Sequence, residues 1–402
     1  MPYPDHMSHI SSTAASDTPA HWQPLHVVLT TNACGGHEIM LLEWLSHASQ
    51  TLGVPVTLHM KPIKELLDKA QSKGLSIELM DRTPHRKFPI LNLVADIRQT
   101  RDELKKIPLT APVLFAPGIV QASPWHLWVA GMMGYKTVAY VPMAHPSAVM
   151  SLRWPALRDW LVGHAIKHVT HWITITEQQK AMLREVWHVR TPVHVIPNKL
   201  SKASTMPNSA PRLSDQRRLR VLFLGRFDRN QKGLDWLVQT LHEQAPELIQ
   251  DFEFVFQGQG PYQPALEQLA QAHPGFVQIW PWGEAAQAFA QVDVLMLCSR
   301  FEGFPLVAIE AALHGVPVMA SDRCGLSDVL PANGVFPFGD ISAWLACLQA
   351  MKQLHQRAAN TEHMLEKMAS LLSQETFTQC IQHALLAIQG QGDGRMRLNA
   401  AR

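Results

Sequence analysis

The sequence predicts an α/β protein built from two doubly wound domains that face each other across a cleft. Its 402 residues exceed the usual length of one domain, which is ~100–200 residues. Short apolar runs alternate with helical patterns twice along the chain, which is typical of βαβ units with a mostly parallel sheet. A polar stretch with two prolines and four serines separates the two series. We therefore expect domains at 25–200 and 217–388, a linker at 201–216, and flexible tails at 1–24 and 389–402.

The first domain opens with an apolar strand at 25–30, followed by a turn at 32–36 and a helix from Gly36. A second helix is expected at 63–73, where Gly74 suits a left-handed cap. The remaining strands are expected at the apolar, β-branched runs 54–59, 76–80, 113–116, 137–142, 172–176 and 193–196.

The second domain repeats the pattern after the linker. The run 220–224 (RVLFL) predicts its first strand and Gly225 the turn that follows. Further strands are expected at 252–257, 277–280, 292–298, 317–320 and 334–336. Helices are expected at 234–242, 264–272, 305–314 and within 341–388, and we expect the last of them to pack back on the first domain.

The composition excludes several classes of protein. Hydrophobic residues make up 47% and charged residues 17%, so the chain is neither disordered nor fibrous. A net charge of +2 gives no case for nucleic-acid binding. The five cysteines form no CxxC pair, which indicates neither a disulfide framework nor a zinc site. Residues 1–24 have no basic start and no apolar core, unlike a secretory signal. We expect a cytoplasmic protein without a metal or cofactor.

One region tests this assignment, because residues 107–135 contain no charged residue over 29 positions. A membrane-spanning helix needs ~20 predominantly apolar residues. Prolines and glycines divide this stretch into short pieces, so we interpret it as buried strand, loop and helix.

Charge is distributed unevenly between the two halves. Residues 25–198 carry 18 Lys/Arg and 12 Asp/Glu, a net charge of +6, whereas residues 216–402 carry 14 and 18, a net charge of −4. This asymmetry suggests two lobes with different partners, although chance variation in surface charge explains it equally well.

The candidate binding residues lie where the predicted strands end, because ligands bind doubly wound sheets outside the carboxyl ends of the strands. Gly35 and Gly36 separate the first strand from its helix, which suits backbone N–H contact with an anion. A tight structural turn explains them as well. The sequence lacks both GxGxxG and GxxxxGK[ST], which argues against a standard dinucleotide site or P-loop.

In the second domain, Arg226 and Lys232 flank one strand-to-helix loop. An arginine fork and a lysine point charge beside a helix start suit a diphosphate. The alternative is a pair of solvated surface cations. The sequence contains no Asp-x-Asp, so a metal-free stabilisation of the diphosphate is favoured.

Two glutamates mark the most informative segment. Glu302 precedes a flexible Gly303 at a strand end, and Glu310 lies within the apolar helix that follows. A charged carboxylate in such a helix is unfavourable unless it has a partner. That partner is either a hydroxyl-rich ligand or a structural salt bridge.

These segments resemble the retaining glycosyltransferases of the GT-B fold, family 4. EGFPLVAIEA at 302–311, GVPV at 315–318 and the loop from Gly225 to Gly233 carry the resemblance. Supporting similarities are GGHEIMLLEWLSHA at 35–48, ITITEQQKAML at 173–183 and VIPNKL at 195–200.

The resemblance implies roles for individual residues. Arg226 and Lys232 would bind the donor diphosphate, Glu310 would bind the ribose hydroxyls, and Glu302 would lie near the sugar or its phosphates. His145 would contact the donor sugar. The phosphate and acceptor side would include Gly35, Gly36 and Asn198. The donor-binding set would be Gly225, Arg226, Lys232, Glu302, Gly303, Phe304 and Glu310, and the catalytic set Arg226, Lys232, Glu302 and His145.

The acceptor is expected to meet the first domain. Residues 90–106 place apolar side chains on one helical stripe. The basic residues around it are Arg82, Arg86, Lys87, Arg98, Arg101, Lys105 and Lys106. Such an element suits an anionic membrane surface, although an ordinary surface helix shows the same pattern. The expected partners are a nucleotide-sugar donor, a saccharide or lipid-linked acceptor and the inner face of the plasma membrane. The alternatives are a nucleotide-sugar epimerase, a phosphorylase or a non-catalytic nucleotide-binding protein.

Overall fold

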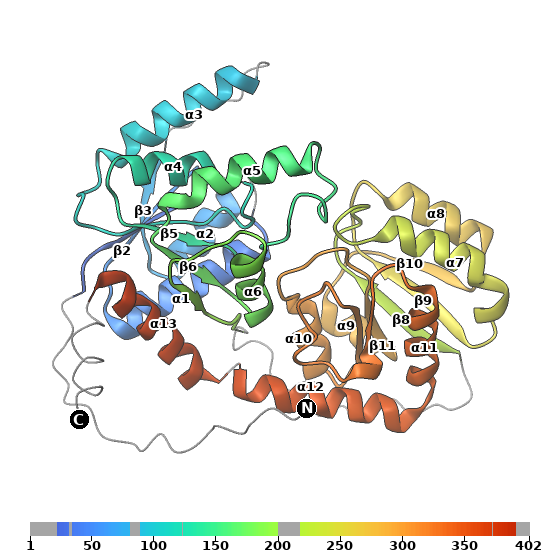
Figure 1. Ribbon diagram of the computed structural model, residues 1–402. Coiled ribbons are helices and arrows are strands. Elements are labelled where there is room, and N and C mark those ends of the chain that lie inside the picture. Colours follow the sequence, from blue (N-terminus) through green and yellow to red (C-terminus); the bar gives the residue numbers. More distant parts are fainter. Residues whose placement is uncertain are drawn as a thin grey trace.

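The computed structural model describes residues 22–31, 34–80, 89–122, 124–199, 218–371 and 373–390. Two lobes lie side by side, one from each half of the chain (Figure 1). Several predicted features fall outside the described residues. They are the linker at 201–216, most of both tails, residues 32–33 of the glycine turn, and Arg82, Arg86 and Lys87 of the basic cluster.

The N-terminal lobe contains a seven-stranded parallel sheet in the order β3-β2-β1-β4-β5-β6-β7. Its strands are β1 (Leu25–Val28), β2 (Val56–Met60), β3 (Ser76–Leu79), β4 (Val113–Phe115), β5 (Thr137–Tyr140), β6 (His171–Thr174) and β7 (Val193–Val195). Its helices are α1 (Gly36–Leu52), α2 (Lys64–Ser72), α3 (Pro89–Leu104), α4 (Pro124–Met132), α5 (Pro155–Ala165) and α6 (Glu177–Glu185), with a 3₁₀ turn at Ile166–His168. Separate apolar cores cover the two faces of the sheet, which explains why its central strands read as continuous apolar runs.

The C-terminal lobe contains a six-stranded parallel sheet in the order β10-β9-β8-β11-β12-β13. Its strands are β8 (Leu219–Leu224), β9 (Phe252–Gln257), β10 (Val277–Trp280), β11 (Val294–Leu297), β12 (Val318–Ser321) and β13 (Val335–Phe336). Its helices are α7 (Leu234–Leu248), α8 (Gln263–Ala272), α9 (Ala285–Phe289), α10 (Leu306–Leu313), α11 (Ile341–Lys352) and α12 (Leu354–Leu371), with a 3₁₀ turn at Ala332–Gly334.

The last helix, α13 (Gln374–Gln389), returns to the N-terminal lobe (Figure 1). Its buried residues Phe377, Ile381 and Leu385 belong to the same apolar core as α1. The backbone N–H of Gln23 also donates to the Gln389 side chain at 2.9 Å. The chain therefore crosses between the lobes a second time through α12.

The predicted α/β class with two doubly wound sheets is confirmed. The uncharged stretch at 107–135 contains the buried strand β4 and the helix α4, as interpreted from its prolines and glycines. Within the described parts of the chain, no helix has the length and apolar character needed to cross a membrane. The helices α5, α6 and α9 were not predicted from the sequence.

In each sheet the strand order reverses at a central pair, β1/β4 in one lobe and β8/β11 in the other, which is the topological switch point. The loops that leave these four strands at their carboxyl ends are the expected ligand-binding segments. Three of these loops carry the glycines of 35–36, the cations of 226–232 and the Glu302 segment.

Candidate active site

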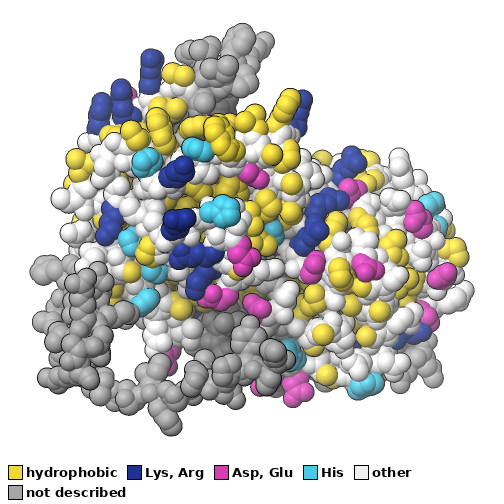
Figure 2. All heavy atoms as spheres, viewed as in Figure 1, with side chains coloured by type: hydrophobic (Ala, Val, Ile, Leu, Met, Phe, Trp, Pro, Cys, Tyr) yellow, Lys and Arg dark blue, Asp and Glu magenta, His cyan; other side chains and the backbone are white. Residues whose placement is uncertain are grey.

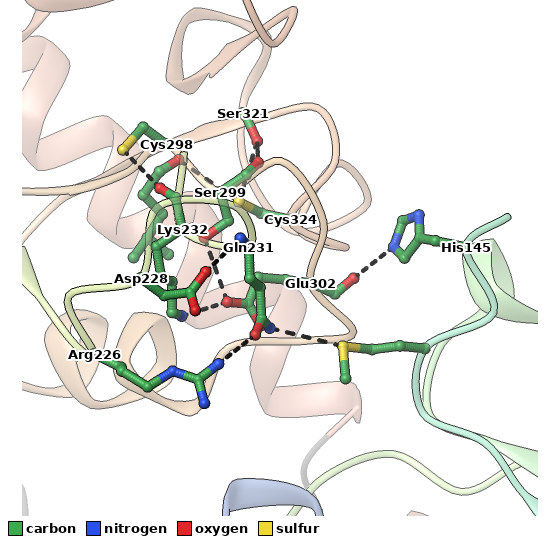
Figure 3. Close-up of polar contacts among 12 residues, drawn as sticks. His145, Arg226, Asp228, Gln231, Lys232, Cys298, Ser299, Glu302, Ser321 and Cys324 are labelled. Atoms are coloured by element: carbon green, nitrogen blue, oxygen red, sulfur yellow. Dashed lines mark hydrogen bonds and ion pairs between the residues drawn. The ribbon is translucent and has the colours of Figure 1, made fainter. Parts of the chain in front are cut away.

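An ion pair between Lys232 and Glu302 lies at the centre of the C-terminal side of the cleft (Figure 3). Lys232 closes the loop between β8 and α7, and Glu302 lies in the loop between β11 and α10. The Ser299 hydroxyl donates to the same Glu302 carboxylate oxygen at 3.3 Å. The Lys232 and Glu302 side chains are 15% and 12% exposed. Burial opposes the charge on Lys232, but the Glu302 carboxylate outweighs it and raises the pKa of Lys232, so the ammonium stays charged.

Gly233 lets this lysine approach the neighbouring strand. It has φ 64°, in the left-handed region, and caps the N-terminus of α7. A Cβ at this position would lie 2.3 Å from the Cys298 carbonyl oxygen. Any larger residue would therefore push the Lys232 loop away from the end of β11.

Arg226 lies at the other end of the same loop, where its guanidinium donates to the Gln231 side chain at 2.8 Å. The Gln231 backbone N–H donates to Asp228 at 2.7 Å, which tightens the loop. Arg226 is exposed, so its remaining donors face solvent in the cleft. The loop thus presents one largely buried cation, 15% exposed, and one exposed cation.

Arg300 braces this loop from the β11 side. Its guanidinium donates to the carbonyl oxygen of Asn230 at 2.8 Å and to both carboxylate oxygens of Asp235 at 3.0 and 3.1 Å. The backbone N–H of Arg300 donates to the Gln231 carbonyl oxygen at 2.8 Å. The guanidinium also lies 5.0 Å from the Phe338 ring centroid. Arg300 was not singled out from the sequence, although its place directly after a strand end was a usable signal.

His145 of the N-terminal lobe reaches the same site. Its Nε2 lies 3.1 Å from the Glu302 carbonyl oxygen, and since a carbonyl only accepts, Nε2 carries the proton. The Gln179 amide donates to that carbonyl oxygen at 3.2 Å and its own oxygen accepts from the Ala144 N–H at 2.6 Å. Burial lowers the pKa of His145, with the Glu302 contact opposing the shift. The imidazole is therefore neutral at pH 7.

Gly303 allows the two lobes to approach at this point. A Cβ there would lie 2.5 Å from the Pro142 carbonyl oxygen and 3.0 Å from Ile175. The adjacent Phe304 carbonyl oxygen accepts from the Asn198 amide at 3.2 Å. His145 and Asn198, both on the N-terminal lobe, thus hydrogen-bond the carbonyl groups on either side of Gly303.

Glu310 lies on α10, apart from the Lys232–Glu302 pair. Within the described residues its carboxylate forms no hydrogen bond or ion pair. Burial raises its pKa, and the nearby His314 only partly offsets this effect. The structural salt bridge considered from the sequence is thus not found among these residues, which leaves the carboxylate available to a ligand.

On the opposite wall, Gly35 and Gly36 precede α1. The Gly35 N–H donates to the buried Glu38 carboxylate at 2.9 Å, and the other Glu38 oxygen lies 3.0 Å from His37 Nε2. A Cβ on Gly36 would lie 4.0 Å from Leu306, the first residue of α10. The glycine turn therefore faces the start of the helix that carries Glu310.

A cavity of about 840 Å³ also lies between the lobes, near α6 and α13. Asn198 and Phe304 line it, whereas Arg226, Lys232 and Glu310 do not. Six of the predicted residues thus fall into two groups. Lys232, Glu302 and His145 are connected through the carboxylate and the carbonyl oxygen of Glu302, with Arg226 in the same loop as Lys232. Asn198 and Phe304 meet on the side of this cavity.

Across the described ranges, no three His, Cys, Asp or Glu side chains gather as a candidate metal site. Around the β8/β11 switch point, the Glu302 carboxylate is paired with Lys232 and the Asp235 carboxylate with Arg300, and the Asp228 carboxylate accepts from the Gln231 N–H.

Comparison with known proteins places Arg226, Lys232 and Glu302, but not His145, in a segment that matches a known family. Residues 218–374 match the family described as Glycosyl transferases group 1. Sulfoquinovosyl transferase SQD2 of Arabidopsis thaliana is 31% identical over 144 residues, which are 34% of this chain and 27% of that protein. The phosphatidyl-myo-inositol mannosyltransferase of Mycobacterium leprae (strain TN) is 32% identical over 168 residues, or 39% of this chain and 43% of that protein. The chain thus matches less than half the length of these curated relatives.

The fold extends the likeness to nearly the whole chain. The apo form of the lipopolysaccharide outer core galactosyltransferase WaaB superposes with a TM-score of 0.67 at 15% identity. The alignment covers 91% of this chain and 99% of that one. At this identity the likeness concerns the fold, which is the GT-B fold that the sequence predicts.

Proposed function

We propose that this protein is a glycosyltransferase that moves a sugar from a nucleotide-sugar donor to a saccharide or lipid-linked acceptor in cell-surface polysaccharide or glycolipid synthesis. The observation that carries the proposal is the loop from Arg226 to Lys232, which faces Glu302 at the β8/β11 switch point. This loop lies inside the segment that matches Glycosyl transferases group 1. The name of the matched mannosyltransferase refers to a phospholipid, and that of the structural neighbour refers to lipopolysaccharide. Both names support the proposed class of acceptor.

In the proposed reaction, the donor diphosphate binds between Arg226 and Lys232. Lys232 then exchanges its contact with Glu302 for phosphate oxygens, and Glu310 accepts hydrogen bonds from the ribose hydroxyls. When the bond between the sugar and the β-phosphate breaks, negative charge grows on the phosphate. Fixed cations that meet this charge are usually the largest catalytic contribution. These residues supply them without a bound metal ion.

We propose retention of configuration through attack on the same face of the sugar. The acceptor hydroxyl oxygen bonds to the anomeric carbon as the phosphate oxygen leaves. The hydroxyl proton passes to that departing phosphate oxygen, so the products are the glycoside and a nucleoside diphosphate. His145 contacts the donor sugar from the other lobe in this arrangement, and the acceptor approaches past Gly35 and Gly36.

The test is an incubation with UDP-, GDP- and ADP-sugars, with and without cell-envelope acceptors. We expect nucleoside diphosphate release that depends on acceptor, survives EDTA and yields a product with the donor's anomeric configuration by NMR. An inverted product would overturn retention, and restoration by a divalent cation after chelation would overturn metal independence. A changed sugar nucleotide formed without acceptor would identify an epimerase instead. We place the reaction at the inner face of the plasma membrane.

A further inference from the structure

The helix α5 exposes a stripe of large apolar side chains. Trp154, at its N-cap, is 73% exposed, Leu157 53%, Trp160 59% and Leu161 38%. Their spacing of three and four residues places them on one side of the helix. Single exposed apolar residues are ordinary, but a contiguous group that contains two tryptophans marks an interaction surface.

Cations flank this stripe and acidic residues are nearly absent around it. Arg153, Arg158 and Lys167 are exposed, and none forms an ion pair with a described residue. Residues 107–170 contain a single acidic residue, Asp159. Its carboxylate oxygens accept from the Ser147 N–H at 3.2 and 3.1 Å, so this negative charge is hydrogen-bonded to the protein's own backbone.

Trp154 is held outward by an unusual backbone. It has φ 56° and ψ 54°, in the left-handed region that a bulky residue rarely adopts. Pro155 follows directly at the first position of α5. The strain yields no burial of the indole within the protein, since the side chain stays largely in solvent.

The neighbouring helices extend the same face. The helices α3, α4 and α5 lie together on the outer side of the N-terminal lobe (Figure 1). Figure 2 shows hydrophobic side chains gathered over this part of the lobe, with Lys and Arg near its edges. On α3, however, Lys105 and Lys106 are paired with Asp102 and Glu103 at 3.2 and 2.9 Å. The basic helix expected from the sequence is thus partly neutralised, unlike α5.

We propose that the α5 surface, formed by Trp154, Leu157, Trp160 and Leu161 with Arg153, Arg158 and Lys167, binds an anionic phospholipid membrane. Tryptophan and leucine suit the boundary between headgroups and acyl chains, and unpaired cations suit anionic headgroups. A second copy of this chain is a poorer occupant. In a twofold dimer, the same surface would meet itself and bring its cations together.

The surface is also tied to the candidate active site. Asp159 of α5 holds the backbone of Ser147, two residues after His145. The Gln121 amide donates to the His145 carbonyl oxygen at 2.9 Å and contacts the Ser147 hydroxyl at 3.4 Å. The helix α5 is therefore hydrogen-bonded to the same loop that reaches Glu302. A role of the α5 surface in sugar transfer rests on the proposed transfer to a lipid-linked acceptor, whereas membrane binding itself does not.

The test is flotation of the full chain with vesicles of phosphatidylcholine and phosphatidylglycerol at 7:3, and of phosphatidylcholine alone, without donor or acceptor. We expect binding to the anionic vesicles that weakens as salt rises. The Trp154→Ser/Trp160→Ser variant should bind at least tenfold more weakly, and Arg153→Gln/Arg158→Gln/Lys167→Gln should lose the preference for anionic lipid. The matched control is Trp282→Ser, which removes a tryptophan of 61% exposure from the other lobe and should bind like the wild type.

Wild-type protein that ignores anionic vesicles would overturn the proposal. So would equal binding by the tryptophan variant, or a loss confined to the α3 variant Arg98→Gln/Arg101→Gln/Lys105→Gln/Lys106→Gln. A concentration-dependent dimer in analytical ultracentrifugation that the tryptophan variant abolishes would assign the surface to a second copy instead. Circular dichroism and Tm confirm folding of each variant. Transfer to a water-soluble acceptor should stay unchanged in the tryptophan variant, so failure here is distinguishable from failure of the proposed activity.

Discussion

The Nε2 of His145 lies 3.1 Å from the carbonyl oxygen of Glu302, and this hydrogen bond joins the two lobes at the residue whose carboxylate holds Lys232. The two contacts use different groups of Glu302. Donor binding that draws Lys232 away from the carboxylate therefore leaves the contact between the lobes intact. His145 positions the Glu302 segment as well as facing the proposed sugar site.

His145→Ala should lower kcat about tenfold or more, because it removes a buried hydrogen bond between the lobes and the proposed sugar contact. Burial lowers the pKa of His145 below 6.5, so loss of activity by its protonation should begin only below that pH. Initial rates between pH 5 and 8 measure both effects. His355→Ala, an exposed histidine on α12, is the control. A His145→Ala rate equal to the wild type would remove His145 from the site.

Replacing Arg226 or Lys232 with Ala should each lower kcat by ~10²–10³, the usual loss for one group that stabilises charge in the transition state. Lys232→Ala also leaves the Glu302 carboxylate without its partner, which affects the stability of the fold. Tm is therefore measured together with the rate. Arg229→Ala removes a 70% exposed cation from the same loop and should leave kcat unchanged. Equal losses in all three variants would indicate a general effect of loop charge.

Glu310→Gln should weaken binding of the nucleoside diphosphate by ~1.5–3 kcal/mol, as expected for hydrogen bonds to a charged group. Burial raises the pKa of Glu310, so wild-type affinity should begin to fall at a higher pH than for an ordinary glutamate as the solution is acidified. Titration calorimetry measures both, with Glu247→Gln on the surface of α7 as the control. Unchanged affinity together with reduced stability would show that Glu310 has a structural role.

The arrangement of strands and the class of site were predictable from local patterns, whereas contacts between distant segments were not. Most predicted strands are continuous apolar runs because both faces of the parallel sheets are buried, whereas the edge strand β3 is largely exposed. The sequence placed Lys232 and Glu302 at strand ends. Their pairing across 70 positions depends on β8 and β11 being neighbours, which no local pattern encodes.

The helix α5 was not predicted for a related reason. Leu157, Trp160 and Leu161 face outward while Val162 and Ala165 are buried, so apolar residues occur on both sides and the usual contrast is missing. The contacts of Gln179 and Arg300 were equally hidden, because both act through backbone carbonyl groups of other segments.

Arg300→Lys should lower kcat at least fivefold although the charge is kept. A lysine cannot reproduce the contacts with Asp235 and the Asn230 carbonyl oxygen together, so the loop that carries Lys232 loosens. The positioning role predicts that Lys232→Ala and the double variant have nearly equal rates, because the brace acts through Lys232. Strictly additive losses would contradict it.

Acid should destabilise the contact of α13 with the N-terminal lobe, where the His383 ring of α13 lies 6.1 Å from the His194 ring and His194 stacks on His171 at 5.8 Å. Burial lowers the pKa values of His171 and His194 to about 4, with nearby cationic groups adding to the shift. Because the unfolded chain binds these protons near pH 6.5, stability is full above 6.5 and falls as the pH drops towards 4. The loss is on the order of a few kcal/mol. Tm measured from pH 7.5 to 4 should fall less steeply in His171→Asn/His194→Asn; an unchanged slope would assign the acid sensitivity to other groups.

The central claim, that the C-terminal lobe binds a nucleotide-sugar donor through Lys232 and Glu310, is tested most directly by thermal stabilisation with UDP-, GDP- and ADP-sugars. A ligand that binds only the folded protein adds about 2.7 kcal/mol of stability at a concentration of 100 Kd, enough to raise Tm by a few degrees. We predict that at least one of these donors raises the Tm of the wild type, and that Lys232→Ala and Glu310→Gln largely abolish the rise. No rise with any donor, or the same rise in the wild type and both variants, would contradict the claim.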